Sequence, residues 1–390
     1  MKTFFIITIL TLTLMGLGKL TNGQEPCRII LFTIDGFHWK APEMLNMPVF
    51  NSLIKEGTYT QKSYVIIPHH PTIGDYSKFN SCSLPNPVLM EGTIFLKPEN
   101  KFLQEVISPK SQSAFIVNTN AYSSVGRGFT NSIMDLTLTD DQVLKQSIEV
   151  LKTQSPRFMR IHLQTSGDNG RAVSASDPDK PYHRNIFEKT SPYALAIENA
   201  DKLLGQLISF LKQSGKWEQT ILIVTSDHGQ SKIGWHPMFE EDSWVTPLLW
   251  VGSGIAKGRQ LNYFEHTDIA PTIAWLLGTE APNNDGGAGN VIKEILDTVE
   301  VKNYAPPQYI KTINHQIKEY NILKSRMILA AETNSYYLNI IAMLENQFLF
   351  SEPFYHENRI TEWYKAGSTE HLIEANENVL QIMRKALNVL

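Results

Sequence analysis

A run of apolar residues that ends in adjacent aspartate and histidine constrains the fold of this chain most strongly. Ile221 to Thr225 are β-prone, and Ser226-Asp227-His228-Gly229 and then Gly234-Trp235-His236 follow them. An apolar run of this length closed by glycine predicts a buried strand with polar side chains at its carboxyl end. In open α/β sheets, ligands and metals bind at that end. An aspartate oxygen and two imidazoles converging there suit Zn²⁺ or a similar divalent ion.

The same arrangement occurs near the start of the chain. Arg28 to Ile34 form a second apolar run, and Asp35-Gly36-Phe37 follow it. Taken alone, an aspartate before a glycine is an ordinary turn residue, and a single polar residue after a strand indicates only a polar turn. Two strands that each present a carboxylate at one edge of a sheet can share a metal, so Asp35 and Asp227 are predicted to lie together.

The composition predicts a large globular protein. The chain has 390 residues, of which 42% are hydrophobic, and this suits one α/β domain with additions or two domains. The formal net charge of −4 argues against a protein that binds nucleic-acid duplexes through a basic surface. Cys27 and Cys82 are the two cysteines, and both a disulfide and two free thiols stay open, as does the oligomeric state.

Residues 1–23 predict a secretory signal peptide. Lys2 precedes an apolar stretch from Phe4 to Leu17, and small and polar residues follow this stretch up to Gly23. A membrane anchor needs about 20 apolar residues, and this stretch is shorter. We therefore expect cleavage near Gly23 or Gln24 and an exported protein, secreted or periplasmic, that does not span a membrane.

Residues 24–298 are predicted to form one α/β domain, because apolar strands alternate there with amphipathic helices. One helix is predicted over Pro192 to Gln213, and another begins at Asp268, whose side chain can cap it. The candidate strands end at Asp35, Asn118, Leu163, Asp227 and Val251.

The pattern changes near residue 302, where Ala305-Pro306-Pro307 interrupts the chain. Long helical stretches follow, from Ile313 to Glu332 and from Thr369 to Leu390, with few candidate catalytic residues. Residues 299–390 are therefore predicted to be a helical C-terminal extension that packs on the main domain or serves association.

Three motifs make residues 28–298 resemble the alkaline phosphatase superfamily, and within it the type I phosphodiesterase/nucleotide pyrophosphatase branch. The motifs are Ile34 to Phe37, then Ser226 to Gly229 with Gly234 to His236, and last Thr267 to Ala274 leading to Leu276-Leu277-Gly278. The resemblance implies a layered α/β/α fold with a mostly parallel central sheet.

The superfamily places a threonine or serine nucleophile some three dozen residues after the first aspartate, at the start of a helix. Pro71-Thr72-Ile73-Gly74 lies at that distance, and Leu84-Pro85 matches the proline that commonly closes this helix. A hydroxyl at a helix N-terminus gains from the positive end of the dipole, and a metal lowers its pKa further. The resemblance implies Thr72 as the nucleophile, with a helix cap as the alternative; Ser63 and Ser77 fit the spacing less well.

The resemblance also implies a divalent metal, expected to be Zn²⁺, as one or two ions. The first ion would be held by Asp35, Thr72, Asp227 and His228. The second site of the superfamily takes an aspartate, a histidine four positions later, and the histidine that is His236 here.

This second site departs from the superfamily pattern. Asp168 is available after the strand that ends at Leu163, but Ala172 stands four positions later. Two alternatives remain. Asp168 and His236 hold a weaker second metal, or Arg171 supplies a fixed positive charge that binds the oxyanion.

These residues predict an exported, metal-dependent hydrolase of small-molecule, lipid or nucleotide phosphate esters, with phosphodiesters favoured. A sulfatase is the first alternative, but sulfatases use a modified residue in Cys/Ser-x-Pro-x-Arg, and Cys82-Ser83-Leu84-Pro85 has another spacing and no arginine. A phosphoethanolamine transferase is disfavoured because no membrane-spanning domain is predicted. A non-catalytic metal-binding relative is the last alternative, supported by the altered segment from Ser166 to Arg171.

Overall fold

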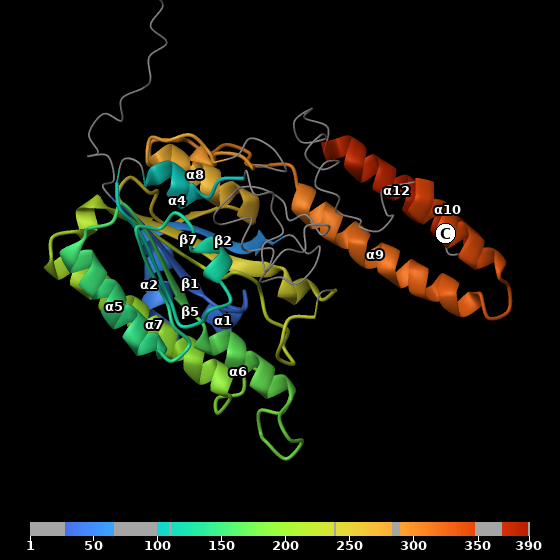
Figure 1. The fold of residues 1–390 in the computed structure, drawn as a ribbon, viewed down its shortest axis with the longest axis horizontal. Coiled ribbons are helices and arrows are strands. Elements are labelled where there is room, and N and C mark those ends of the chain that lie inside the picture. Colours follow the sequence, from blue (N-terminus) through green and yellow to red (C-terminus); the bar gives the residue numbers. More distant parts are fainter. Residues whose placement is uncertain are drawn as a thin grey trace, which may run out of the picture.

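The computed structural model describes residues 28–65, 100–108, 111–237, 239–282, 289–347 and 369–388. Its centre is a sheet with the strand order β4-β3-β5-β1-β6-β7-β2-β8, in which β9 also pairs with β2 (Figure 1). The strands are β1 (Arg28–Ile34), β2 (Gly57–Tyr64), β3 (Ser113–Val117), β4 (Asn131–Met134), β5 (Phe158–Leu163), β6 (Thr220–Thr225), β7 (Val245–Gly252), β8 (Arg259–Gln260) and β9 (Phe264–Glu265).

Helices cover both faces of this sheet and continue beyond it. They are α1 (Ala41–Met44), α2 (Pro48–Glu56), α4 (Leu103–Ile107), α5 (Asp140–Thr153), α6 (Thr165–Ser174), α7 (Pro192–Gln213), α8 (Ile269–Leu276), α9 (Tyr309–Ala330), α10 (Tyr336–Gln347) and α12 (Thr369–Ala386). The helix predicted over Pro192 to Gln213 is confirmed as α7.

The strands β4, β3, β5, β1 and β6 are parallel to one another, whereas β7 runs antiparallel to β6 and to β2. This confirms the predicted mostly parallel α/β sheet. Since β5, β1 and β6 are parallel neighbours, their carboxyl ends meet at one edge of the sheet. The polar residues that follow β1 and β6 in the sequence are therefore brought together.

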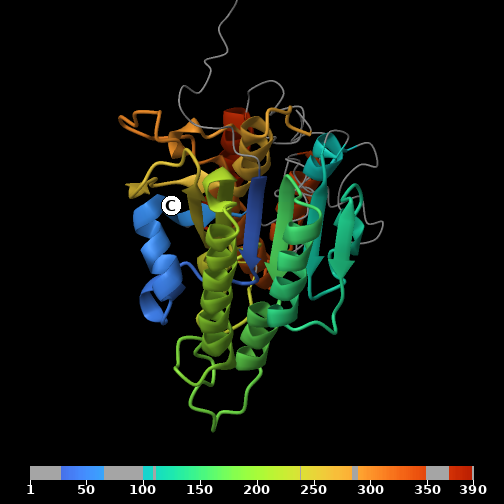
Figure 2. The ribbon, with the colours of Figure 1, turned by 90° about the vertical axis from the view of Figure 1, so that its left-hand side faces the viewer.

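Strand β1 shows why the sheet needs helices on both faces. Ile30, Phe32 and Ile34 pack in the core shared with α2, α5 and α7, while Ile29 and Leu31 pack in the core shared with α4 and α8. Alternate side chains of a strand point to opposite faces, so a strand that is apolar throughout must be covered twice. Figure 2 shows β1, in blue, near the middle of the sheet among these helices.

The segment predicted to be a helical extension contains α9, α10 and α12 (Figure 1). The first turns of α9 pack against the ends of β2 and β7, where Ile310 and Ile313 share a core with Tyr64 and Val245. The later part of α9 forms a separate core with α10 and α12. Within the residues that the structure describes, no helix is both long enough and apolar enough to cross a bilayer. The division near residue 298 stays a prediction.

The prediction that Asp268 caps a helix is wrong. Asp268 stands at the N-cap position of α8, but its side chain makes no capping hydrogen bond. Its backbone is helical (φ −83°, ψ −13°) because a 3₁₀ turn over His266–Asp268 precedes the helix, whereas a capping side chain needs an extended backbone. Its Oδ1 instead accepts a hydrogen bond from the Asn290 amide at 2.6 Å.

Asp268 and Glu265 form a buried carboxyl pair beneath the start of α9. Glu265 Oε1 accepts hydrogen bonds from the Tyr263 hydroxyl at 2.5 Å and from the Ile310 amide at 2.8 Å. Burial, and then the nearby Asp268, raise the pKa of Glu265 above its usual 4.5. Burial also raises the pKa of Asp268. The folded chain therefore keeps protons on this pair at pH values where the unfolded chain has released them.

This pair should make the free energy of unfolding fall as pH rises from about 5 to about 7, because the folded state binds more protons there. Glu265→Gln removes one of the two groups and should flatten this dependence. Urea unfolding at several pH values measures it. Exposed Glu280→Gln is the control and should keep the wild-type slope; an unchanged slope in Glu265→Gln would contradict the prediction.

Candidate metal centre

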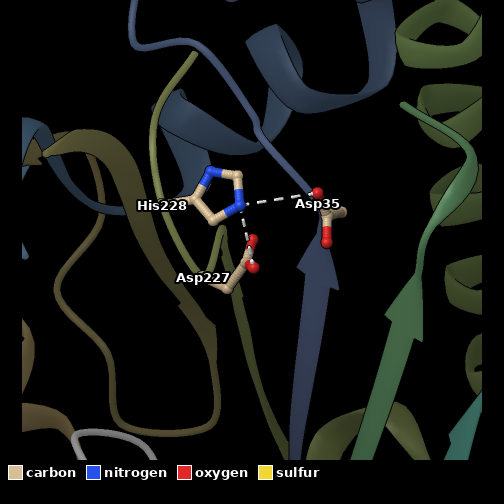
Figure 3. Close-up of side chains that lie close together, drawn as sticks. All are labelled: Asp35, Asp227 and His228. Atoms are coloured by element: carbon tan, nitrogen blue, oxygen red, sulfur yellow. Dashed lines mark ion pairs between the residues drawn. The ribbon is translucent and has the colours of Figure 1, made fainter. Parts of the chain in front are cut away.

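Asp35, Asp227 and His228 converge at the carboxyl edge of the sheet (Figure 3). Asp35 follows β1 directly, and Asp227 follows β6 after one intervening serine. His228 Nε2 lies 3.3 Å from Asp227 Oδ2 and 3.7 Å from Asp35 Oδ1. One ligand atom from each residue lies within 4.8 Å of the other two. The structure thus brings together three of the residues that the sequence predicted to hold the first metal.

Ser226 fastens the two strand ends to each other. Its Oγ accepts a hydrogen bond from the Phe37 amide at 2.8 Å and lies 2.7 Å from the Ile34 carbonyl oxygen. The Gly36 amide donates to Asp227 Oδ1 at 3.3 Å. Gly36 has a φ of +61°, a left-handed conformation that glycine adopts without strain. The turn after β1 therefore holds Asp35 and Asp227 in a fixed relation.

The orientation of His228 leaves one ring nitrogen for a metal. Its Nδ1 lies 2.7 Å from the Gly229 carbonyl oxygen. Since a carbonyl only accepts, Nδ1 carries a proton, and Nε2, which faces the two carboxylates, is the nitrogen that a metal would bind. A backbone carbonyl on the second nitrogen is how metal-bound histidines are commonly oriented.

The burial of this group also fits a cation. Asp35 is 3% exposed and Asp227 is 0% exposed, so two carboxylates lie side by side almost without water. Buried charges are stable only when they are paired, hydrogen-bonded or bound to a metal. Ligand atoms of a tetrahedral site with bonds of roughly 2.1 Å stand about 3.4 Å apart, close to the distances found here. A divalent ion fits the residues present, and their oxygen and imidazole donors suit Zn²⁺ among others.

His162 and Tyr122 support this group, although neither lies in a sequence motif that predicts a site residue. His162 Nδ1 lies 3.3 Å from an Arg160 nitrogen, which can only donate, so Nε2 carries the proton and donates to Asp35 Oδ2 at 3.2 Å. Burial lowers the pKa of His162 to about 3, and the ring is therefore neutral. The Tyr122 hydroxyl donates to Asp227 Oδ2 at 3.0 Å. His162 is hidden inside an apolar strand, and Tyr122 lies in a loop with no motif.

A stack of rings continues from His228 to the surface. The His236 ring lies 4.1 Å from the His228 ring, and Trp235 stacks on His236 at 4.0 Å, measured between ring centroids. The Arg171 guanidinium lies 5.3 Å from the centre of the Trp235 ring. Trp235 has a φ of +67°, which is strained for a bulky residue and is maintained by this packing.

The remaining predicted site residues are placed as follows. Asp168 lies exposed in the first turn of α6, and neither it nor His236 belongs to the three-residue group found among the described residues. Their role in a second metal site stays a prediction, as does the role of Arg171. Thr72 lies outside the described residues. Ser63 Oγ is occupied by hydrogen bonds with Thr246 and His266.

Comparison with protein families gives a match to the model described as "Sulfatase" over residues 101–279. The matched stretch includes Asp227, His228 and His236 and begins after Asp35. Among curated proteins, arylsulfatase K of Xenopus laevis is 32% identical over 119 residues, which are 29% of this chain and 22% of that protein. In this match the chain spans about a fifth of the length of its relative.

Solved structures share the fold. Murine ectonucleotide pyrophosphatase/phosphodiesterase 5 superposes with a TM-score of 0.52 at 13% identity, covering 69% of this chain and 100% of that chain. The phosphonate monoester hydrolase of Silicibacter pomeroyi gives 0.55 at 15% identity, covering 71% of this chain and 78% of that chain. At such identities the likeness shows the fold alone.

Asp227→Asn should sharply lower the amount of metal bound per chain, because it removes one of two negative charges that balance the cation. Elemental analysis after dialysis against a metal buffer measures this. Asp201→Asn is a matched control, since Asp201 is also buried but accepts hydrogen bonds from the Val49 and Phe50 amides away from the centre. Equal metal content in Asp227→Asn and wild type would place the metal elsewhere.

Proposed function

We propose that this chain is a member of the alkaline phosphatase superfamily and a metal-dependent hydrolase of phosphate esters, with phosphodiesters favoured. The observation that supports this most is the group of Asp35, Asp227 and His228, buried at the carboxyl edge of a mostly parallel sheet. The phosphodiesterase named in the structural comparison shares this fold.

In this proposal the chain's residues divide the work. Asp35, Asp227 and His228 would hold a divalent ion, expected to be Zn²⁺, which would supply positive charge to polarise an ester oxygen and lower the pKa of a nearby hydroxyl. The Thr72 hydroxyl loses its proton as its Oγ1 forms a bond to phosphorus, and the leaving oxygen takes up a proton as its own bond to phosphorus breaks. Water then cleaves the phosphothreonine and restores the hydroxyl. His162 and Tyr122 keep the two carboxylates in position throughout.

Sulfate esters are the second candidate substrates. The matching family model and the relative named arylsulfatase K favour them. Against them stands the sequence around Cys82, which differs in spacing from the modified-residue motif and has no arginine. A direct comparison of aryl phosphodiesters, phosphomonoesters and sulfates decides between the two ester classes. Export through residues 1–23 belongs to the same proposal.

Thr72→Ala should abolish hydrolysis of every ester that the wild type cleaves, because no other group would form the covalent intermediate. Thr72→Ser should keep part of the activity. Turnover of aryl phosphodiesters, phosphomonoesters and sulfates is measured for each variant, with metal content and circular dichroism as checks of folding. Ser77→Ala, five residues away, is the control and should keep wild-type turnover. Near-normal turnover in Thr72→Ala would exclude this nucleophile.

Arg171→Ala should lower kcat/KM through loss of one preorganised donor to the substrate's non-bridging oxygens, at a cost of about 2 to 4 kcal/mol. Its guanidinium lies 5.3 Å from the centre of the Trp235 ring, which stacks on His236. Exposed Arg326→Ala on α9 is the control. Unaltered kcat/KM and metal content in Arg171→Ala would assign this arginine to the surface.

A further inference from the structure

Gln230 is a buried glutamine beside the metal centre, two positions after His228. Its side chain is 0% exposed. Within the described residues, neither its Oε1 nor its Nε2 has a hydrogen-bond partner. Burying an amide without a hydrogen bond costs free energy, so native chains rarely do it without a bound water, ion or ligand at that place. The position of Gln230 therefore calls for a partner from outside the chain.

Glycines surround this amide where side chains would otherwise fill the space. A Cβ on Gly170 would stand 1.7 Å from Gln230 Nε2, and a Cβ on Gly36 would stand 2.8 Å from its Oε1. Gly36 is in the turn that follows Asp35, and Gly170 is in α6. The Gln230 amide thus lies between α6 and the turn that follows Asp35 at the end of β1.

Gly167, on the same helix, packs against the metal centre itself. A Cβ on Gly167 would stand 1.7 Å from Asp35 Oδ1, and the Gly167 Cα lies 3.6 Å from the Cβ position of Gly36. Gly167 and Gly170 are three positions apart, so they share one face of α6. This face brings bare backbone against Asp35 and Gln230. Neither position can supply a carboxylate or an imidazole to a second ion.

The polar backbone groups near the amide are already paired. The Gly36 amide donates to Asp227, and the Gly36 carbonyl accepts from the Tyr193 hydroxyl at 2.8 Å. The Ser166 hydroxyl donates to the Asp35 carbonyl at 2.6 Å. These groups are engaged with each other and not with Gln230, which leaves a ligand at the metal as a candidate partner for the amide.

We propose that Gln230 is an oxyanion-binding residue: its Nε2–H donates a hydrogen bond to a non-bridging oxygen of the ester bound at the Asp35–Asp227–His228 centre. This inference rests on the proposed function and names a neutral donor for that site. It holds for phosphate and for sulfate alike, since both present non-bridging oxygens. Gln230 acts from inside the protein, whereas Arg171 approaches from the exposed face of α6.

Gln230→Met tests this proposal because it keeps the side-chain volume and removes the amide. Gln104→Met is the matched control: Gln104 is equally buried, but its Nε2 donates to the Val125 and Arg127 carbonyls at 2.9 and 2.8 Å, away from the centre. Three quantities are measured for both and for wild type: urea unfolding of metal-free protein, metal bound per chain, and the dissociation constants of inorganic phosphate and sulfate from metal-loaded protein by calorimetry.

We expect Gln230→Met to be at least as stable as wild type without metal, because it removes an unpaired amide. Its metal content should equal wild type, and its dissociation constant for phosphate or sulfate should rise about tenfold. Gln104→Met should show the reverse: lower stability and unchanged anion binding. If Gln230 had only a structural role, its substitution could not weaken anion binding while leaving the stability and the metal content intact.

Two results would overturn the proposal while leaving the proposed function intact. One is unchanged anion affinity in Gln230→Met, which would mean that the amide binds only an internal water. The other is a clear loss of stability in metal-free Gln230→Met, which would mean that the amide has a partner within the chain. If metal-loaded wild type binds neither anion and cleaves no ester, the proposed function and this inference are both overturned.

Discussion

The structure around the metal centre depends on two buried carboxylates that lie close together with little water between them. Asp35 and Asp227 stand at the ends of adjacent parallel strands, and their mutual repulsion would separate them if nothing compensated. The chain compensates with neutral donors. The Gly36 amide, the Tyr122 hydroxyl and the His162 ring each donate to one carboxylate oxygen. These three donors are neutral, so they do not cancel the negative charge of the pair, and this charge suits a cation.

Close backbone approach is the second condition for this centre. Gly167 brings α6 against Asp35, and the loop before His236 comes so close to α6 that a Cβ on Gly234 would lie 2.3 Å from the Gly170 carbonyl oxygen. Glycine at such positions excludes side chains that could contribute to a second metal. The same feature that makes the centre compact therefore limits the number of protein ligands around it.

The sheet and the first metal ligands follow from the sequence because the signal is local. Apolar runs ending in Asp35 and Asp227 need only parallel pairing to bring these residues together, and the amphipathic pattern of α7 defines its own bounds. The supporting residues are different, since their role depends on the neighbouring strand. His162 has the sequence context of a core residue. The helix cap predicted at Asp268 fails for a similar reason. The preceding 3₁₀ turn gives Asp268 a helical backbone, and residue propensities do not predict that turn.

The glycines of α6 illustrate a further limit of sequence interpretation. In the sequence, the segment from Ser166 to Arg171 is notable for the metal ligands that it lacks, and this predicts either a weaker second ion or an arginine in its place. The structure shows that Gly167 and Gly170 form the surface on which Asp35 and Gln230 pack. The segment that departs from the superfamily's metal-ligand pattern is therefore the segment whose glycines allow close packing against Asp35 and Gln230.

The turn after β1 and the motif after β6 meet across a large separation in the sequence: Gly36 and Asp227, which share a hydrogen bond, are 191 positions apart. The ligand set therefore does not exist in any short fragment, and it forms only when β1 and β6 pair. Long-range parallel pairing is a slow and late step in folding. An ion that binds this set stabilises the completed sheet and not its precursors. Metal binding by this chain would therefore indicate that the native sheet has formed. The metal concentration during folding would influence the fraction of chains that reach the native state.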